Sequence, residues 1–520
     1  MRGTRFAVRM MLGLVMAGAG TPATAATELR VGSASEIDTQ ALRSAIETTR
    51  GDTAAATPSD IPMRVLDIEE AIRIALEHNL RLQIAALDRD IFEREVPARR
   101  AFFHPTPGFN FVATDARVEN PLDIPDGDGP IVKESGSVND DSQLSQAFVR
   151  QELPTGAQVT VGVDLLRASG DHFAGDEVYE GGAQIELRQP LMRGGRIYVA
   201  TAPIRDAEYS VGILESRLRA QILQVMAEAK QAYYNTILAE QLIQVSEQAI
   251  ARDRELIEAS EALFRAGRAS QRDIVSAQIQ LSDDLSDLAA RRAELDNAQL
   301  ALRDVLGLAI GGYLKPADSS VPFEPVALRL GQWIEHALAN RPEIQEILYR
   351  LDQSALAVRV AGNAVLPKLD LVGIFRRRDF DTSSRRVWGF DSQSWLAGVE
   401  FEVPFGNVAA RERLRALALQ YARIERELEN QRRLIEVEVR TEEVSLRENL
   451  AELEAQTDKV EQARSKLDIA QVRYQRGISD NLDVTDAQQD LVDAESDLLA
   501  AVVDYTNGLA RLEARIAGPL

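Results

Sequence analysis

The chain has 520 residues, a formal net charge of −22 and no cysteine. Nucleic-acid binding needs a basic face that neutralises phosphates, so this charge argues against a nucleic-acid partner. Without cysteine no disulfide can form. Only 5% of the residues are aromatic, which favours long helices packed through small side chains.

The first 26 residues are predicted to be a signal peptide. Arginines are followed by the apolar run Met10–Ala19 and then by the small residues Ala23–Ala25, which is the order that secretory signals share. Residues 27–62 are polar, and we expect a loosely ordered leader there. The protein is therefore expected to leave the cytoplasm.

A first half is predicted over residues 63–310. Apolar residues at helical spacing indicate a helix from Leu66 to about Phe103, just before a proline. Strands are expected within about 107–190, followed by a long helix over about 204–265. Apolar residues of the long helix alternate in steps of four and three, the spacing of a coiled-coil seam. Its length corresponds to about 93 Å at ~1.5 Å per residue.

A second half is predicted over residues 328–518, after a linker at 311–327, and it repeats the order of the first. The expected elements are a helix from Leu330 to about Val365, strands over about 369–377 and 395–403, and a long helix over about 409–475.

The strand region of the first half, 105–190, is 48 residues longer than that of the second, 367–404 (85 against 37). This surplus predicts an additional hairpin, in which Phe148–Leu153 pairs with 159–165 across a tight Pro-Thr-Gly turn. The chain is then expected to form six strands. Long polar loops are predicted at about 118–144 and 168–181.

The two halves are copies of one design. At a constant offset of 210 residues Gly267 corresponds to Gly477, and at an offset of 262 the segment 66–79 corresponds to 328–341. A repeat of this length indicates a duplicated half-protein rather than a short repeating unit.

Three motifs carry a resemblance to a known family. They are LDIEEAIRIALEHN (66–79) with LRLGQWIEHALANR (328–341), the strand-to-helix junctions RQPLMRGGR (188–196) and EVPFGNVAAR (402–411), and RYQRGISDNLDVTDAQQDLVDAESDL (473–498) with its weaker twin at 263–288. In this order and in duplicate, they resemble the TolC-like outer-membrane efflux proteins over residues 62–518.

The resemblance implies a mainly α-helical fold with a β portion. Duplicated helix–strand–strand–helix halves would form a long α-helical coiled-coil tunnel plus a transmembrane β-barrel, both built by a homotrimer. The family pattern of four strands per chain would give twelve barrel strands, whereas the six strands predicted for this chain would give eighteen.

The implied function is an outer-membrane exit duct of a tripartite efflux or type I secretion system, extending into the periplasm. It would passively conduct what an inner-membrane pump expels, with a periplasmic adaptor protein and outer-membrane lipid as further partners. The alternative is a soluble periplasmic coiled-coil adaptor or scaffold, a class in which strand pairs would not recur in duplicated order.

The resemblance also implies a gate at the periplasmic helix tips, and its selectivity carboxylates fall on Asp483 and Asp486. Carboxylates crowded around a narrow mouth attract cations and tune ion passage. The structural alternative is helix capping, because Asp480 and Asp483 have the spacing of an N-cap and an N3 residue. Ser270 and Asp273 repeat this spacing in the first half.

Two further sets of tip residues follow from the resemblance. Tyr474 and Asp273 match positions that link neighbouring tips, although Tyr474 also suits a coiled-coil seam. The family's arginine two residues after the tip glycine is replaced by Ser479, so the full link is not expected. Adaptor hairpins would dock on Gly267, Arg268, Ala269, Ser270, Gly477, Ile478 and Ser479, where the glycines also suit helix C-caps.

No catalytic site is expected. The four histidines lack metal-ligand spacing, and no HExxH, Walker A or GxSxG motif occurs. We therefore expect no enzymatic activity, no bound metal and no cofactor. Four aromatic residues are predicted to face lipid or, alternatively, to pack in a core: Phe109, Phe111, Trp395 and Phe401.

Overall fold

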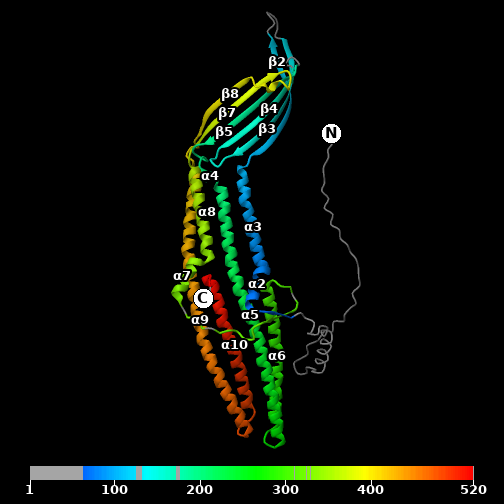
Figure 1. Cartoon of the computed structure of the whole chain (residues 1–520), viewed down its shortest axis with the longest axis vertical. Helices are drawn as coiled ribbons and strands as arrows, with labels where there is room; N and C mark the ends of the chain where they lie inside the picture. The colour runs from blue at the N-terminus through cyan, green and yellow to red at the C-terminus, as the bar shows by residue number, and fades with distance from the viewer. Residues whose placement is uncertain are drawn as a thin grey trace, which may run out of the picture. The chain divides into compact units, whose positions relative to one another are not determined.

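The computed structural model describes residues 63–518 apart from 125–131, 171–175, 310, 324 and 328 (Figure 1). The predicted signal peptide and polar leader lie outside the described residues. Within them, one antiparallel sheet joins long helices that run in pairs away from it.

The sheet has six strands in the order β2-β3-β4-β5-β7-β8, as predicted from the length of the strand regions. The additional hairpin is present, because Glu152 pairs with Gln158 across the tight turn. Strand bounds are β2 Thr106–Ile124, β3 Val132–Glu152, β4 Gln158–Gly170, β5 Val178–Pro190, β7 Lys368–Asp381 and β8 Ser392–Glu402.

The prediction of a long polar loop at 118–144 was wrong. Strands β2 and β3 continue through the described part of that range and remain paired as far as Ile124 with Val132. The sequence lacks apolar alternation there, but a ladder of backbone hydrogen bonds does not need it once a neighbouring strand is in register. The loop expected at 168–181 is also shorter, since β4 reaches Gly170 and β5 starts at Val178.

One face of the sheet is apolar from edge to edge. Directly paired residues point to the same face, and the register pairs Phe109 with Ala147 and Phe375 with Trp395. These side chains remain uncovered, with Trp395 at 78% exposure and Phe109 at 68%. The four predicted aromatic residues therefore do not pack in a core. The same face carries Phe111, Val149, Val161, Val163, Ile185, Leu371, Val399 and Phe401.

The opposite face carries ion pairs. The Arg188 guanidinium donates to Asp370 at 3.1 Å and to Glu400 at 2.6 Å. Lys368 donates to Glu400 at 2.9 Å. The sheet thus has one apolar and one charged side, which is the division expected when the two sides meet different solvents.

Each half contains a broken helix, a long helix and a shorter return helix. A short helix, α4 (Ile197–Ala200), and two 3₁₀ turns, η2 (Ala101–Phe103) and η4 (Val387–Gly389), lie beside the sheet strands in the chain. In the first half the helices are α2 (Ile68–His78), α3 (Leu80–Arg100), α5 (Ala202–Arg265) and α6 (Gln271–Leu306). In the second they are α7 (Leu330–Asn340), α8 (Pro342–Ala364), α9 (Val408–Gln475) and α10 (Leu482–Ile516).

The helices expected at 66–103 and 330–365 are each interrupted at one corresponding residue. Asn79 ends α2, accepts from the backbone N–H groups of Arg81 and Leu82, and donates to the Val305 carbonyl at 2.8 Å. In the second half Arg341 occupies the break and donates to Glu438 at 2.7 Å. A long-range partner therefore holds each break open.

Two short strands that the sequence analysis does not predict pair beside this break. β1 (Met63–Leu66) runs parallel to β6 (Tyr313–Pro316), which lies in the expected linker. Leu66 packs into the same core as Leu306 and Tyr233. The Tyr233 hydroxyl donates to the Leu66 carbonyl at 3.2 Å and to Asp318 at 2.9 Å. The linker is thereby fastened to the long helix α5.

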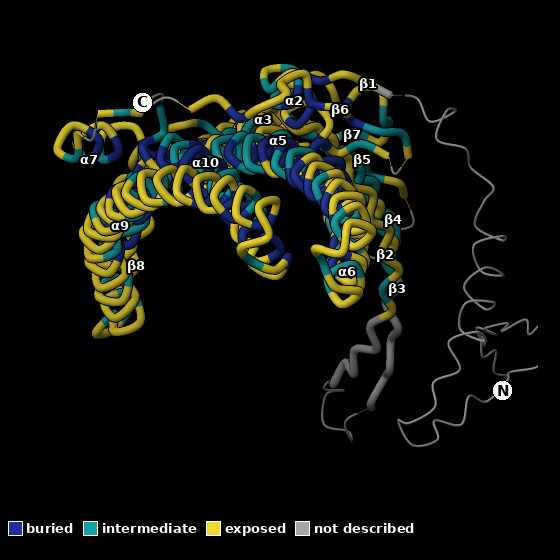
Figure 2. Tube along the Cα trace, turned by 90° about the horizontal axis from the view of Figure 1, so that it is seen from below, coloured by how far each residue is buried: buried dark blue, intermediate teal, exposed yellow. Residues whose placement is uncertain are grey.

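Burial is unequal among the long helices, as Figure 2 shows. In α10, 15 of 35 residues are buried, but in α9 only 10 of 68. Large faces of α9 and α6 are exposed in the single chain. None of the helices in the described ranges has the length and apolar character needed to cross a membrane.

Glycine is required where α6 ends. Gly307 has φ 65°, and a Cβ there would lie 2.3 Å from the carbonyl oxygen of His78. The corresponding residue of the second half, Ala517, adopts φ 57° with its Cβ in place. The close approach to His78 therefore decides the residue type more than the backbone conformation does.

Replacing Gly307 with Ala is expected to lower the free energy of unfolding by about 1–3 kcal/mol, because a left-handed backbone and a clash are combined. Thermal unfolding followed by circular dichroism measures the change. The control is Gly331→Ala in α7, where a Cβ meets nothing within 4 Å and helix propensity improves. Equal stability of the wild-type protein and Gly307→Ala would contradict this account.

Candidate functional site

The two helical hairpins end in turns of the same construction. Gly267 and Gly477 are left-handed, with φ 73° and 70°. In the first turn Arg268 N donates to the Leu263 carbonyl at 2.8 Å, and in the second Ile478 N donates to the Arg473 carbonyl at 2.9 Å. Both glycines therefore close their helices as C-caps, the alternative that accompanied the docking prediction.

The two tips of one chain contact each other. Arg268 Nη2 donates to the Arg476 carbonyl at 3.2 Å, and the Asn481 side chain donates to the Asp273 carbonyl. The predicted docking residues of the first and second hairpin thus belong to one continuous surface.

The first hairpin has the capping box expected from its sequence. Ser270 Oγ accepts from Asp273 N at 3.3 Å, and the Asp273 carboxylate accepts from Ser270 N at 2.8 Å. The second hairpin differs, because Asn481 is the N-cap and makes no side-chain cap. Asp480 was therefore wrong as an N-cap. Asp483 lies in the first turn of α10, where its charge complements the helix N-terminus.

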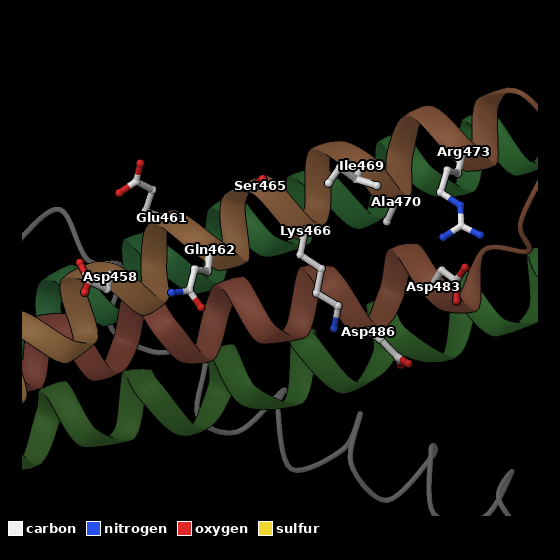
Figure 3. A pocket seen from close by; sticks show the side chains of 10 residues that line it. All are labelled: Asp458, Glu461, Gln462, Ser465, Lys466, Ile469, Ala470, Arg473, Asp483 and Asp486. Atoms are coloured by element: carbon white, nitrogen blue, oxygen red, sulfur yellow. The ribbon is translucent and has the colours of Figure 1, made fainter.

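The carboxylates of Asp483 and Asp486 line an open groove of about 720 Å³ between α9 and α10 (Figure 3). Both side chains are exposed. Lys466 and Arg473 reach from α9 toward the side of α10 that carries them. The two predicted gate residues therefore share one groove with two cations of the same chain.

Lys466 is one of the counter-charges of this acidic group. Its ammonium binds Asp490, and that hydrogen bond, followed by the charges of Asp490, Asp486 and Asp483, raises the pKa of Lys466 above its ordinary value. Lys459, one heptad earlier, donates to Asp497 at 2.7 Å.

The basic line of Lys459, Lys466 and Arg473 on α9 was not predicted from the sequence. Its signal was a spacing of seven residues, which keeps side chains on one face of a coiled-coil helix. In α5 the corresponding residues are Ala249, Leu256 and Leu263, so the line belongs to the second half alone.

Tyr474 is 4% exposed and packs in the core shared by the two hairpins. Its hydroxyl lies 2.8 Å from Ser260 Oγ on α5. Burial raises the pKa of Tyr474, and the charge of Asp273 adds to the effect. Within one chain Tyr474 is therefore bound to Ser260, while the Asp273 carboxylate caps its own helix. Their predicted link between neighbouring tips stays a prediction.

The chain is similar to known proteins in both sequence and fold. The family model described as outer membrane efflux protein matches residues 71–308 and 333–518. The outer membrane efflux protein BepC of Brucella suis is 25% identical over 369 residues, covering 69% of this chain and 77% of BepC. The alkaline protease secretion protein AprF of Pseudomonas aeruginosa is 23% identical, covering 63% and 68%.

Among solved structures, the outer-membrane channel OprN superimposes with a TM-score of 0.65 at 16% identity, covering 87% of this chain and 90% of OprN. This likeness concerns the fold. Because the family model matches both halves, the chain belongs to the outer membrane efflux protein family and is an exit duct of the outer membrane that reaches into the periplasm.

Proposed function

We propose that three copies of this chain form one duct of a tripartite efflux or type I secretion system. The duct passively conducts material that an inner-membrane pump delivers through a periplasmic adaptor protein. The observation that carries the proposal is a set of uncovered surfaces in the single chain. These are the apolar sheet face, the two sheet edges and an apolar stripe on α3.

The sheet edges need partners. β2 and β8 are the outermost strands, and an edge strand presents unpaired N–H and C=O groups. Pairing β8 of one copy with β2 of the next would close three six-stranded sheets into a barrel of eighteen strands (3 × 6). The apolar face would then meet outer-membrane lipid, and the face with Arg188 would line the water-filled side.

The stripe on α3 needs a partner as well. Leu80, Ile84, Leu87 and Ile91 recur in steps of four and three and are 60–66% exposed. Burial of such a side chain contributes about 1.5–3 kcal/mol, so a row of four favours association. In the second half the equivalent helix, α8, packs against both α5 and α9, whereas α3 packs against α5.

The duplication supports one partner for this stripe. An offset of 262 maps Ile84, Leu87 and Ile91 onto Glu346, Tyr349 and Gln353. All three of these residues contact α5. Glu346 accepts from Arg217 at 2.7 Å, the Tyr349 ring lies against Gly212, and Gln353 donates to Asp206 at 3.0 Å.

The α5 residues of this contact have counterparts on α9 at the repeat offset of 210 residues. Asp206, Gly212 and Arg217 correspond to Ala416, Ala422 and Glu427. Ala416 and Ala422 are exposed, and so is Leu419 between them. The stripe of one copy would therefore pack on this small apolar face of α9 in the next copy, and repetition of the contact would close a ring.

This contact can be tested by cross-linking, because the chain has no cysteine of its own. The double variant Leu87→Cys with Ala422→Cys, treated with a short bis-maleimide in outer membranes, is expected to give covalent dimers and trimers on denaturing gels. Tyr349 and Gly212 make the corresponding contact within the chain.

Each single cysteine variant serves as a control and should stay monomeric on the gel. A second control pairs Leu87→Cys with Asp504→Cys on α10, which the duplication does not place in contact. Cross-linked trimers from that pair, or none from Leu87 with Ala422, would contradict the proposed interface.

The gate would lie where the tips of three copies converge. Two carboxylates per chain, Asp483 and Asp486, would put six at the mouth (2 × 3). Lys466 offsets part of their charge within each chain. If Tyr474 exchanges its bond with Ser260 for one with Asp273 of a neighbouring tip, the closed mouth gains on the order of 1 kcal/mol, because a hydrogen bond to a charged group contributes more than one between neutral groups. The continuous surface of the two turns would receive the adaptor.

Replacing Asp483 and Asp486 together with Asn is expected to raise single-channel conductance in planar bilayers. It should also weaken block by multivalent cations at least about tenfold, which corresponds to ~1.4 kcal/mol. The physical reason is loss of fixed negative charge at the narrowest point.

The matched control is Asp504→Asn, because Asp504 lies on the same face of α10, about six turns from Asp483. Its cation block should equal that of the wild-type protein. Equal block in all three proteins would leave Asp483 and Asp486 with no role in gating.

A further inference from the structure

Two buried aspartates meet between α5 and α6, above the first tip. Asp253 is 2% exposed and Asp284 8%. Asp253 lies twelve residues before the end of α5 at Arg265, or about 18 Å at ~1.5 Å per residue. Neither residue belongs to an ion pair in the described part of the chain.

The two carboxyl groups lie close enough across the α5–α6 hairpin to shift each other's pKa and to share a hydrogen bond. Carboxylate oxygens only accept, so such a bond requires one proton between them. Gln280 Nε2 donates to Asp284 Oδ1 at 2.9 Å, and this hydrogen bond favours the ionised form of Asp284. No other group among the described residues donates to the buried Asp253 Oδ2. The proton therefore resides on Asp253.

The duplicated half shows that packing does not require this pair. At the offset of 210 residues, Asp253 corresponds to Ala463 and Asp284 to Ala494. Both alanines are buried in the hydrophobic core of the tips. The first hairpin thus has two buried aspartates at the positions where the second hairpin has two buried alanines.

A chain of hydrogen bonds leads from the pair to the surface. Gln280 Nε2 also donates to Gln489 Oε1 on α10 at 3.2 Å, and Gln489 Nε2 donates to Asp493 at 2.9 Å. Asp493 is exposed. The pair is therefore connected to the second hairpin as well as to its own.

The charged groups around the pair act in opposite directions. Arg252 on α5 favours the ionised form, and its Nε and Nη2 are buried without a hydrogen-bond partner. Asp287 on α6 opposes ionisation, and α10 contributes Gln489 and Asp493 through the relay. Burial outweighs the attraction of Arg252 and, with the charge of Asp284, raises the pKa of Asp253 to about 7.

We propose that Asp253 and Asp284 form a proton-binding site that clamps α5 to α6, and that loss of the shared proton loosens the first tip. Two adjacent carboxylates without a proton repel each other in a site that water does not reach. The proposal needs only the hairpin of a single chain, so it stands independently of the trimer and of the gate aspartates.

The direction of the pH effect follows from linkage. The folded hairpin holds the Asp253 proton more tightly than the unfolded chain does, because its pKa is raised. The stabilisation is complete below the ordinary carboxyl pKa of about 3.9 and declines as pH rises toward neutrality. The tip should therefore be tight in acid and looser above neutral pH.

The test uses the full-length protein in detergent, titrated from about pH 5 to about pH 9 across the expected transition. Infrared spectroscopy should show one protonated carboxylic acid per chain, lost with a midpoint near neutral pH. Hydrogen exchange of residues 264–272, corrected for intrinsic rates, should rise through the same midpoint. Residues 330–340 of α7, which lie outside both tips, are the internal reference.

Asp253→Asn copies the protonated state and is expected to remove both the infrared band and the pH dependence, leaving the first tip protected at high pH. Asp283→Asn, an exposed neighbour on α6, is the matched control and should titrate like the wild-type protein. If the Asn variant does not fold, Asp253→Ala with Asp284→Ala reproduces the alanine pair of the second hairpin.

At about pH 6, between the ordinary carboxyl pKa and the raised pKa of Asp253, the infrared band should be present. Its absence from the wild-type protein at that pH would overturn the proposal. So would an unchanged titration in both Asp253 variants. Loss of the band on addition of Na⁺ or Ca²⁺ at constant pH would show that the pair binds a metal cation instead, and would equally overturn it.

Discussion

Close packing of α5 against α10 holds the two halves of this chain together, and the other arrangements depend on it. Both helices are rich in buried small residues, among them Ala229 and Ala232 on α5 and Ala501 and Ala510 on α10. Small side chains let helix backbones approach closely, and many such contacts sum to a large dispersion energy. Polar pairs fix the register, since Asn507 donates to Asn235 at 3.0 Å and Lys230 binds Glu513.

This central contact leaves the outer helices incomplete. α5 and α10 find partners on several sides within the chain, whereas α3, α6 and α9 retain uncovered apolar residues. In a duplicated chain these uncovered faces can be buried without a new interface, because the contact made between the two halves can be repeated between copies. The same logic applies to the sheet, whose two edge strands belong to different halves. A closed duct then requires no new type of contact.

Aspartate serves contrasting purposes within a short stretch of the hairpins. Asp483 and Asp486 are exposed and face a groove with Lys466, so their charge is open to solvent. Asp253 and Asp284 are buried, and their environment favours sharing a proton over carrying two charges. Asp273 is occupied by its own helix N-terminus. Burial and partners, rather than residue type, separate the three roles.

Local patterns in the sequence were enough to predict the helices, the tip glycines, the duplication and the count of six strands. Hydrophobic period, glycine and proline act over a few residues, so they can be read without knowing what lies opposite. The capping box of Ser270 and Asp273 is of this kind, because both partners lie in one turn. The function as an outer-membrane duct was expected from the resemblance to a known family, and the family match established it.

Only the tertiary structure decided the features that depend on distant partners. The break at Asn79 needs the Val305 carbonyl, and the extension of β2 and β3 needs their mutual register. Tyr474 finds Ser260 across 214 residues. The pairing of Asp253 with Asp284 also appears only when α5 and α6 fold back on each other. A residue's sequence neighbours set its helix or strand, but the groups that desolvate it or share its proton are brought by the fold.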